Sequence, residues 1–441
     1  MVGTVDKRVL EVLRKASDKE FQKKYLTNPN AYSREGSQRM TFEDMTMFVL
    51  SNTGKTLSAE VLKYFERTGK IENTITKQAV SKQKQHIKSE MFEDLNKMYV
   101  KEVRNAKRET YKGYYIIATD GSTLEIPNIK KLKEIYGEAK ASETSVSNAR
   151  AGLNGFYDAL NHVMVKLVVD KYQRGEKTVF LENVQEVLEM YEEEKVLFIF
   201  DRGYICLELL LELDGLEEKY LFRVPSNCYK KEINAAKTDD ENIQVKITKA
   251  RLNKVPKEKQ KEYLEQEYKE VRLVKVELDT GEIEYLITNL SKEEVSYEEM
   301  KALYYQRWNI EKTFNILKNR LHIENISSRT KNGIEQEIHA TVFLCNIIED
   351  MAQELNKKIK KKENNKYSYK ININILAGTL KTYFMYFFCH KIIDVKIKET
   401  YYKAMLKYIK QNIVPIKTGL KNPRIKRVSR NKHKTNIRMN M

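Results

Sequence analysis

Two apolar runs that each end on an aspartate constrain the fold of this chain more than any other feature: Tyr114–Asp120 and Val196–Asp201. Each has the length and composition of a buried strand. The other predicted elements nearby are strands at 151–158 and 163–170, a helix at 182–194, a helix at 206–213 and a strand at 220–224. Three neighbouring strands followed by helix, strand, helix and strand is the order of an RNase H-like mixed sheet. We therefore predict an α/β fold of that class.

The two aspartates are predicted to meet at one end of this sheet. In an RNase H-like sheet the first strand is central and the fourth lies beside it, so Asp120 and Asp201 become neighbours. A later helix laid across the sheet can add Glu311. Three carboxylates at one place can hold two divalent cations, and oxygen ligands favour Mg²⁺ or Mn²⁺ over zinc. Taken singly, each aspartate is more simply explained as a turn residue at the end of a strand.

The segment 302–318 is predicted to place four polar side chains on one helix face: Tyr304, Arg307, Glu311 and Lys318. At about 100° per residue, these four fall within an arc of roughly 60°. A single carboxylate among a phenol, a guanidinium and an ammonium suits a site that holds a metal ion and a phosphate together. The alternative is a solvated helix face with an i,i+4 Arg–Glu pair.

The residues around these positions resemble the motifs of a known enzyme family. Asp120 stands in Ala-Thr-Asp-Gly-Ser-Thr, Asp201 stands in Phe-Asp-Arg-Gly-Tyr, and the spacing Tyr-(2)-Arg-(3)-Glu-(6)-Lys is complete. Together they resemble the DDE transposases with the YREK signature, which are the bacterial insertion-sequence transposases of the IS-four family. The resemblance covers about residues 111–350. Family members also carry a β insertion between the second Asp and the Glu, which agrees with the long separation of Asp201 from Glu311.

The resemblance implies a cut-and-paste transposase in which Asp120, Asp201 and Glu311 are the catalytic metal ligands for two Mg²⁺ or Mn²⁺ ions. Activated water would nick one strand at each transposon end. The freed 3′ hydroxyl would then attack other phosphates, first across the duplex to give a hairpin and later in target DNA. Since two ends must be cut together, a homodimer on double-stranded DNA is expected, bound to the inverted-repeat ends and the target.

The resemblance also implies which residues bind DNA. Tyr304, Arg307 and Lys318 would hold the phosphates of the transposon end beside the scissile bond. Trp308, the only tryptophan of the chain, could stack on an unstacked base or could anchor the core. Arg202 could contact DNA, and a helix-capping or ion-pair role is equally consistent with its position.

Two other functions are consistent with parts of this pattern. Another RNase H-like enzyme, such as a nuclease or resolvase, would explain the three acids but not the phenol, guanidinium and ammonium at their spacing. An inactive, domesticated DNA-binding protein would explain the basic residues but not the three acids.

The charge of the chain favours a polyanionic partner. The 80 Lys and Arg exceed the 62 Asp and Glu by 18, and the pI is about 9.3. A general bias toward Lys, Asn and Ile explains many of the lysines but not their clustering. Scattered cysteines predict neither a zinc site nor a disulfide framework. No apolar run approaches the roughly 18 residues of a membrane span, so a cytoplasmic protein is expected.

The chain is predicted to have five parts: a helical, DNA-binding region at 1–110, the first part of the catalytic core at 111–225, a β-rich insertion at 226–292, the second part of the core at 293–358, and a C-terminal helical region with a basic tail at 359–441. The N-terminal helices resemble either a helix-turn-helix module or a plain bundle. The tail from Gln411 has nine Lys or Arg and no acid, so we predict that it binds DNA.

Overall fold

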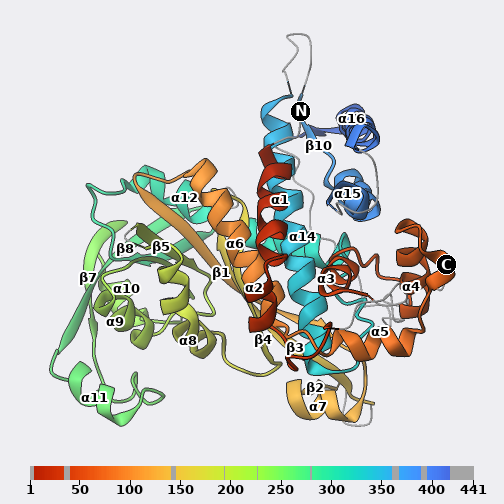
Figure 1. Cartoon of the computed structure of the whole chain (residues 1–441). Coiled ribbons are helices and arrows are strands. Elements are labelled where there is room, and N and C mark those ends of the chain that lie inside the picture. The colour runs from red at the N-terminus through yellow and green to blue at the C-terminus, as the bar shows by residue number, and fades with distance from the viewer. Residues whose placement is uncertain are drawn as a thin grey trace. The chain divides into compact units, whose positions relative to one another are not determined.

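The computed structural model of the chain describes residues 4–33, 40–140, 146–192, 194–225, 227–278, 281–359, 367–388 and 395–417. The chain divides into two compact units, whose elements are drawn in Figure 1. The first unit comprises Met1–Val103, Leu124–Ala151 and Asn315–Met441, and the second comprises Arg104–Thr123 and Gly152–Phe314. The five parts expected from the sequence are a finer division than this one and stay a prediction.

The described sheet confirms the predicted fold class. Its strands are β1 (Tyr114–Glu125), β2 (Glu138–Ala139), β3 (Asn148–Asp158), β4 (Val163–Lys171), β5 (Lys195–Phe200), β6 (Lys219–Val224), β7 (Asp240–Lys246), β8 (Tyr268–Glu277) and β9 (Ile283–Thr288). They pair in the order β2-β3-β1-β5-β6-β9-β8-β7, and β4 pairs with β3. The run β4-β3-β1-β5-β6, with β1, β5 and β6 parallel, is the mixed RNase H-like order.

The segment 226–292 contains the strands β7, β8 and β9, which do not form a separate sheet. β9 pairs antiparallel with β6, β8 pairs with β9, and β7 pairs with β8, so the three strands extend the central sheet at its β6 edge. The physical reason is that β6 would otherwise expose a row of backbone donors and acceptors, which the antiparallel β9 satisfies. Two short helices, α10 (Lys230–Ala235) and α11 (Lys257–Tyr263), lie in the connections.

The first predicted strand is longer than its apolar run Tyr114–Asp120, because β1 continues without a break through Gly121-Ser122-Thr123 to Glu125. Leu124 is fully buried and anchors this continuation. Gly121 is accommodated inside the strand because the Glu176 side chain packs against it: a Cβ at Gly121 would lie 2.0 Å from Glu176 Oε1. Asp120 is therefore a residue within a strand and does not end one.

Aromatic side chains fill the core beneath the centre of the sheet in the second unit. The Phe200 and Phe222 rings on β5 and β6 stack with centroids 4.2 Å apart. Phe180 of helix α8 (Glu176–Glu189) lies edge-on to Phe200 and Phe198, at 5.0 and 5.3 Å. Helix α9 (Leu207–Gly215) packs against β6 (Figure 1). This aromatic packing joins α8, β5 and β6 next to the end of β5, which Asp201 follows.

The β3–β4 connection is a tight turn at Asn161-His162. His162 adopts a left-handed backbone conformation with φ 56°. The buried Asp158 carboxylate accepts hydrogen bonds from the Asn161 backbone N–H (3.0 Å) and side-chain amide (2.9 Å), and also from the Tyr191 hydroxyl (3.1 Å). Asp158 is thus a structural acid of the turn.

The first unit is mainly helical. Its helices are α1 (Thr4–Ala16), α2 (Lys19–Lys24), α3 (Phe42–Leu50), α4 (Leu57–Arg67), α5 (Lys77–Lys84), most of α6 (Glu90–Lys107), α7 (Lys130–Tyr136), α14 (Lys331–Lys357), α15 (Ile373–Phe388) and α16 (Val395–Gln411). Helix α14 is buried over most of its length and contacts α1, α3 and α15 (Figure 1). None of the helices in the described ranges is long and apolar enough to cross a membrane.

Buried ion pairs tie α14 to the N-terminal helices of the same unit. Asp350 accepts hydrogen bonds from Arg8 of α1 and from the Tyr99 hydroxyl of α6, at 2.5 and 2.8 Å. Lys84 at the end of α5 pairs with Glu337 at 2.7 Å. Both pairs are almost inaccessible to water, so breaking either would leave an uncompensated buried charge.

The predicted C-terminal basic tail begins later than Gln411. Residues Ile413–Ile416 form strand β11, which pairs antiparallel with β10 (Ser368–Ile371). The pairing occurs because Ile413 and Val414 continue directly from α16 with β-branched side chains. Eight of the nine basic residues predicted to bind DNA, all beyond Lys417, lie outside the described residues.

Candidate active site

The strand register brings Asp120 and Asp201 together. β1 and β5 are parallel, and their last paired residues are Thr119 and Phe200. Asp120 directly follows Thr119, and Asp201 directly follows Phe200. Both aspartates therefore follow the same register pair, at the same end of the two strands. Neighbouring strands lie about 4.8 Å apart, and residues in register point to the same face. The backbones of Asp120 and Asp201 therefore lie one residue beyond the last paired residues of adjacent strands.

Helix α13 (Trp308–Asn319) seats Glu311 over this sheet. The seat is Gly155 on β3, where an added Cβ would lie 3.2 Å from both Ile310 and Phe314. A larger residue at 155 would hold α13 away from the strand. Glu311 follows Ile310 and is about one-third exposed, on the side of the helix that is not buried against β3.

The predicted single helix through 302–318 is wrong, because the backbone breaks into α12 (Tyr297–Tyr305) and α13. The residues between them form a tighter turn, in which Arg307 N donates to Tyr304 O at 3.0 Å and Ile310 N donates to Arg307 O at 3.3 Å. Tyr304 therefore lies on α12, Arg307 lies in the turn, and Glu311 and Lys318 lie on α13. The four side chains do not share one uninterrupted helix face.

Arg307 lies among the acids of the site. We call these acids, which are Asp120, Glu176, Asp201, Glu284 and Glu311, the acidic cluster. Arg307 is 2% exposed, and its Nη2 donates to Glu311 Oε1 at 2.8 Å. Its guanidinium stacks on the half-exposed Trp308 ring, 4.6 Å from the centroid, so Trp308 neither anchors the core nor is fully free. Among the described residues, no hydrogen-bond partner reaches Arg307 Nε and Nη1, Tyr304 Oη or Asp201 Oδ1, although all are buried. Buried polar groups without partners are costly, which is typical of a site that awaits a ligand.

The environment of Asp120 reflects the crowding of acids. The pKa of Asp120 is raised to about 7, mainly by burial; Arg307 and the Gly121 N–H oppose this rise, and the charges of Glu311 and Glu176 add to it. The Gly121 N–H donates to Asp120 Oδ1 at 2.9 Å. Asp120 is thus close enough to Glu311, Glu176 and Arg307 to be affected by all three charges.

Two further carboxylates, those of Glu176 and Glu284, lie near Asp201 and were not predicted from the sequence motifs. Burial raises the pKa of Glu176, and the charge of Asp201 adds to this. Glu284 on β9 pairs with Arg223 at 2.8 Å, and Arg223 lies 4.0 Å from Asp201. Glu176 could have been suspected from the glycines that follow both aspartates, since its carboxylate approaches Gly121 and Gly203.

The donor set suits a hard divalent cation, but the ligands are not gathered as a complete site. Asp120 and Asp201 provide oxygen donors directly after the last register pair of β1 and β5, and Asp201 Oδ1 is buried without a hydrogen-bond partner in the described ranges. Glu311 instead contacts Arg307. Across the residues that the structure describes, no three His, Cys, Asp or Glu side chains are close enough together to hold one metal ion.

The remaining predicted site residues differ in how far they are exposed to solvent. Tyr304 is buried, with 3% of its surface exposed. Arg202 is exposed on the turn that follows β5, consistent with a contact to a ligand outside the fold. Lys318 is half-buried on the last turn of α13, in the part of that helix that belongs to the first unit.

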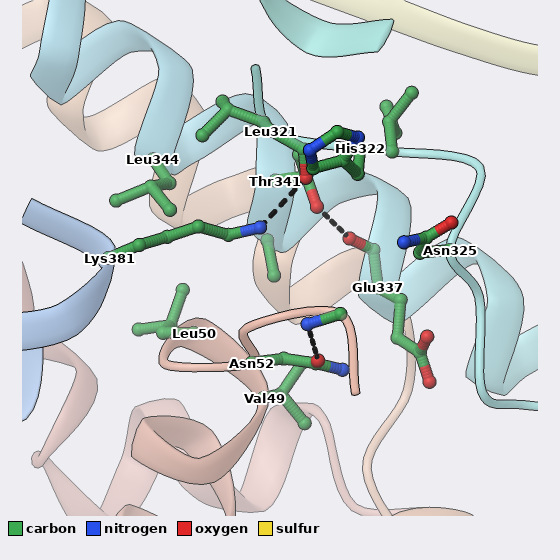
Figure 2. A pocket seen from close by; sticks show the side chains of 13 residues that line it. Val49, Leu50, Asn52, Leu321, His322, Asn325, Glu337, Thr341, Leu344 and Lys381 are labelled. Carbon is green, nitrogen blue, oxygen red and sulfur yellow. Dashed lines mark hydrogen bonds between the residues drawn. The ribbon is translucent and has the colours of Figure 1, made fainter. Parts of the chain in front are cut away.

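A pocket in the first unit is too small to bind a substrate. Its volume is about 20 Å³, which is room for about one water molecule. Figure 2 shows it between the end of α3, the start of α14 and Lys381 of α15, whose ammonium donates to the Leu321 carbonyl at 2.8 Å. Its lining has no pair of acids, so it does not compete with the acidic cluster as a catalytic site.

Comparisons with known proteins identify the family of this chain. A family model described as a transposase DDE domain matches residues 111–347, which are 237 of the 441 residues. Among solved structures, the chain is similar to piggyBac transposase in the cryo-EM structure of its synaptic complex with hairpin DNA. That similarity has 10% sequence identity and a TM-score of 0.43, and it covers 95% of this chain and 83% of the other. No curated protein matches the chain.

Proposed function

The chain belongs to the transposase DDE domain family, and from this premise we propose that it is an insertion-sequence transposase of the YREK group that cuts and rejoins DNA phosphodiesters. The observation that supports the proposal is the register of Thr119 with Phe200, because Asp120 and Asp201 are the residues that follow this pair. The YREK assignment rests on the spacing of four side chains: Tyr304, Arg307, Glu311 and Lys318.

Asp120, Asp201 and Glu311 would hold two Mg²⁺ or Mn²⁺ ions. Such ions, when bound, activate an attacking oxygen and stabilise the leaving one. Glu311 must first exchange its hydrogen bond to Arg307 for this role. A DNA phosphate offers Arg307 a competing anionic partner with bidentate geometry. We therefore propose that binding of the DNA end frees Glu311, so that cleavage is confined to DNA-bound protein.

Other predicted DNA contacts fit this arrangement. Arg202 is exposed beside Asp201 and would meet a phosphate near the scissile bond, while Lys318 would hold a neighbouring phosphate two helical turns beyond Glu311. Tyr304 Oη and two Arg307 nitrogens, buried without hydrogen-bond partners among the described residues, would gain partners from the same backbone. Cleavage at two ends would require a homodimer on DNA, followed by a hairpin intermediate.

A strand-transfer assay tests the proposal. The protein is incubated with Mg²⁺ and labelled DNA that carries the inverted repeats flanking its own gene, together with a target plasmid. The expected products are nicked ends, hairpins and end–target joints. Asp201→Asn is the matched control, since it removes one metal ligand and keeps the size of the side chain. Cleavage of any DNA without joints would instead identify a nuclease, and a band shift without cleavage would identify a DNA-binding protein.

A further inference from the structure

A groove in the first unit, which contains no residue of the acidic cluster, has the composition of a phosphate-binding surface. Its volume is about 590 Å³. One wall is helix α5, the other is the loop 327–330 that precedes α14, and both belong to the first unit. The polar groups that line it are those of Lys, Arg, Ser, Thr and Gln, and no Asp or Glu is among the residues of its lining.

The cations of the groove are available to a ligand. Lys77 and Lys82 on α5 and Arg329 in the loop are exposed. Within the described ranges, none of the three forms an ion pair with a carboxylate. Ser81 and Gln78 lie on the same face of α5, one turn from the lysines, and provide hydrogen-bond donors between them. Lys and Arg with interleaved hydroxyl and amide donors are the side chains that contact DNA phosphates and sugars.

The two walls of the groove are held together by buried contacts. Lys84 is 4% exposed, and its ammonium donates to Ser328 Oγ at 2.8 Å and to Glu337 Oε1 at 2.7 Å. Glu337 also accepts from the Ser327 backbone N–H at 2.7 Å, and Thr330 Oγ1 donates to Gln85 at 2.9 Å. Because the loop is fixed to α5, the cations above it are presented in a set geometry and less conformational entropy is lost on binding.

We infer that this groove, between α5 and the loop 327–330, binds the sugar–phosphate backbone of duplex DNA through Lys77, Lys82 and Arg329. The inference deepens the proposed function and rests on it, since the ligand is the DNA on which the acidic cluster would act. The groove assigns α5 a role in backbone contact, independent of whether the N-terminal helices form a helix-turn-helix. Backbone contact predicts affinity that depends on salt but not on base sequence.

The test compares two triple variants of the full chain by gel shift in Ca²⁺ over a series of salt concentrations. The groove variant is Lys77→Ala/Lys82→Ala/Arg329→Ala. The control is Lys254→Ala/Lys257→Ala/Lys261→Ala, which removes the same charge from exposed residues of the second unit that form no ion pair in the described ranges. Both proteins are measured on inverted-repeat DNA and on unrelated duplex of the same length.

The groove variant should bind both DNAs more weakly, and its slope of log affinity against log salt should flatten by about 2 to 3, or about 0.9 for each phosphate that is no longer neutralised. The control should keep the parental slope. The inference would be overturned if the groove variant kept the parental slope of log affinity against log salt. It would also be overturned if the control variant lost as much slope, or if the groove variant bound only the inverted-repeat DNA more weakly. Strand transfer by the parental protein is scored separately, so failure of the groove and failure of the proposed function are distinguishable.

Discussion

The buried pair of Lys84 and Glu337 should be one of the most sensitive points of the first unit. Replacing Glu337 by Gln keeps the shape of the side chain but removes the charge that neutralises Lys84. The two side chains are only 5% and 6% exposed, so water cannot take the place of the missing charge. Oε1 of Glu337 accepts from Lys84 and from the hydroxyls of Ser327 and Ser328, at 2.7, 2.5 and 2.7 Å.

The expected magnitude follows from these hydrogen bonds. In the Glu337→Gln variant one carboxylate oxygen becomes an NH₂ group, which faces the Ser327 backbone N–H that donated to Oε2. One unsatisfied buried donor costs about 1–3 kcal/mol, and an uncompensated buried ammonium brings the total to about 3–5 kcal/mol. Removing both charges, as in Lys84→Met/Glu337→Gln, should cost less than Glu337→Gln alone.

Urea unfolding of the parental protein, both single variants and the double variant would measure this coupling. Glu337→Gln should also weaken DNA binding, because Glu337 then no longer pairs with Lys84 of α5 while it accepts hydrogen bonds from Ser327 and Ser328 of the loop. The reasoning would be refuted by a destabilisation below about 1 kcal/mol for Glu337→Gln, or by single-variant effects that simply add in the double variant. Either result would show that water reaches the pair and screens its charges.

Three further outcomes are expected. Glu311→Gln should abolish nicking in Mg²⁺ but keep binding to DNA ends in Ca²⁺, and near-parental nicking by this variant would exclude Glu311 as a metal ligand. Lys318→Ala should weaken binding to cleaved DNA ends and leave the metal affinity nearly unchanged. Gly121→Ala should lower the nicking rate at least tenfold with little change in Tm, because the new Cβ must displace the flexible Glu176 carboxylate from 2.0 Å, and a parental rate would contradict this. Burial lowers the pKa of His162 to about 4, so between about pH 6.5 and pH 4 the unfolded chain binds more protons than the folded chain. The free energy of unfolding therefore decreases as the pH falls through that window. His162→Asn, which tolerates the left-handed φ, should remove this decrease when urea unfolding at pH 5 is compared with pH 8.

The core strands β1, β5 and β6 could be predicted from the sequence because each contains an apolar run. Strands β2 and β7 were not predicted, since the first has two residues and the second is largely polar. The extent of β1 was not predictable, since Gly-Ser-Thr is typical of a turn. The break between α12 and α13 has no Gly or Pro to mark it. It depends on the tighter hydrogen bonds of the Arg307 turn.

The acids of the candidate site were predictable to different degrees. Asp120 and Asp201 each end an apolar run or follow one, and the topology makes them neighbours. Glu176 has no motif of its own, and its proximity to both depends on how α8 packs. The burial of Arg307 and its bond to Glu311 are likewise tertiary. The groove at α5 was not predictable, because the contact that builds it joins Lys84 to a residue 253 positions later.

The register between β1 and β5 also limits how such a chain can change its length during evolution. Deleting one residue from β5 would turn its remaining side chains to the opposite face and withdraw Asp201 from Asp120. The same deletion in the connection between β7 and β8, which contains α11, would alter a surface turn and leave every strand pair in place. Insertions and deletions should therefore accumulate between β7 and β8 among related genes, while the span from Tyr114 to Asp120 and the strand before Asp201 keep a constant length.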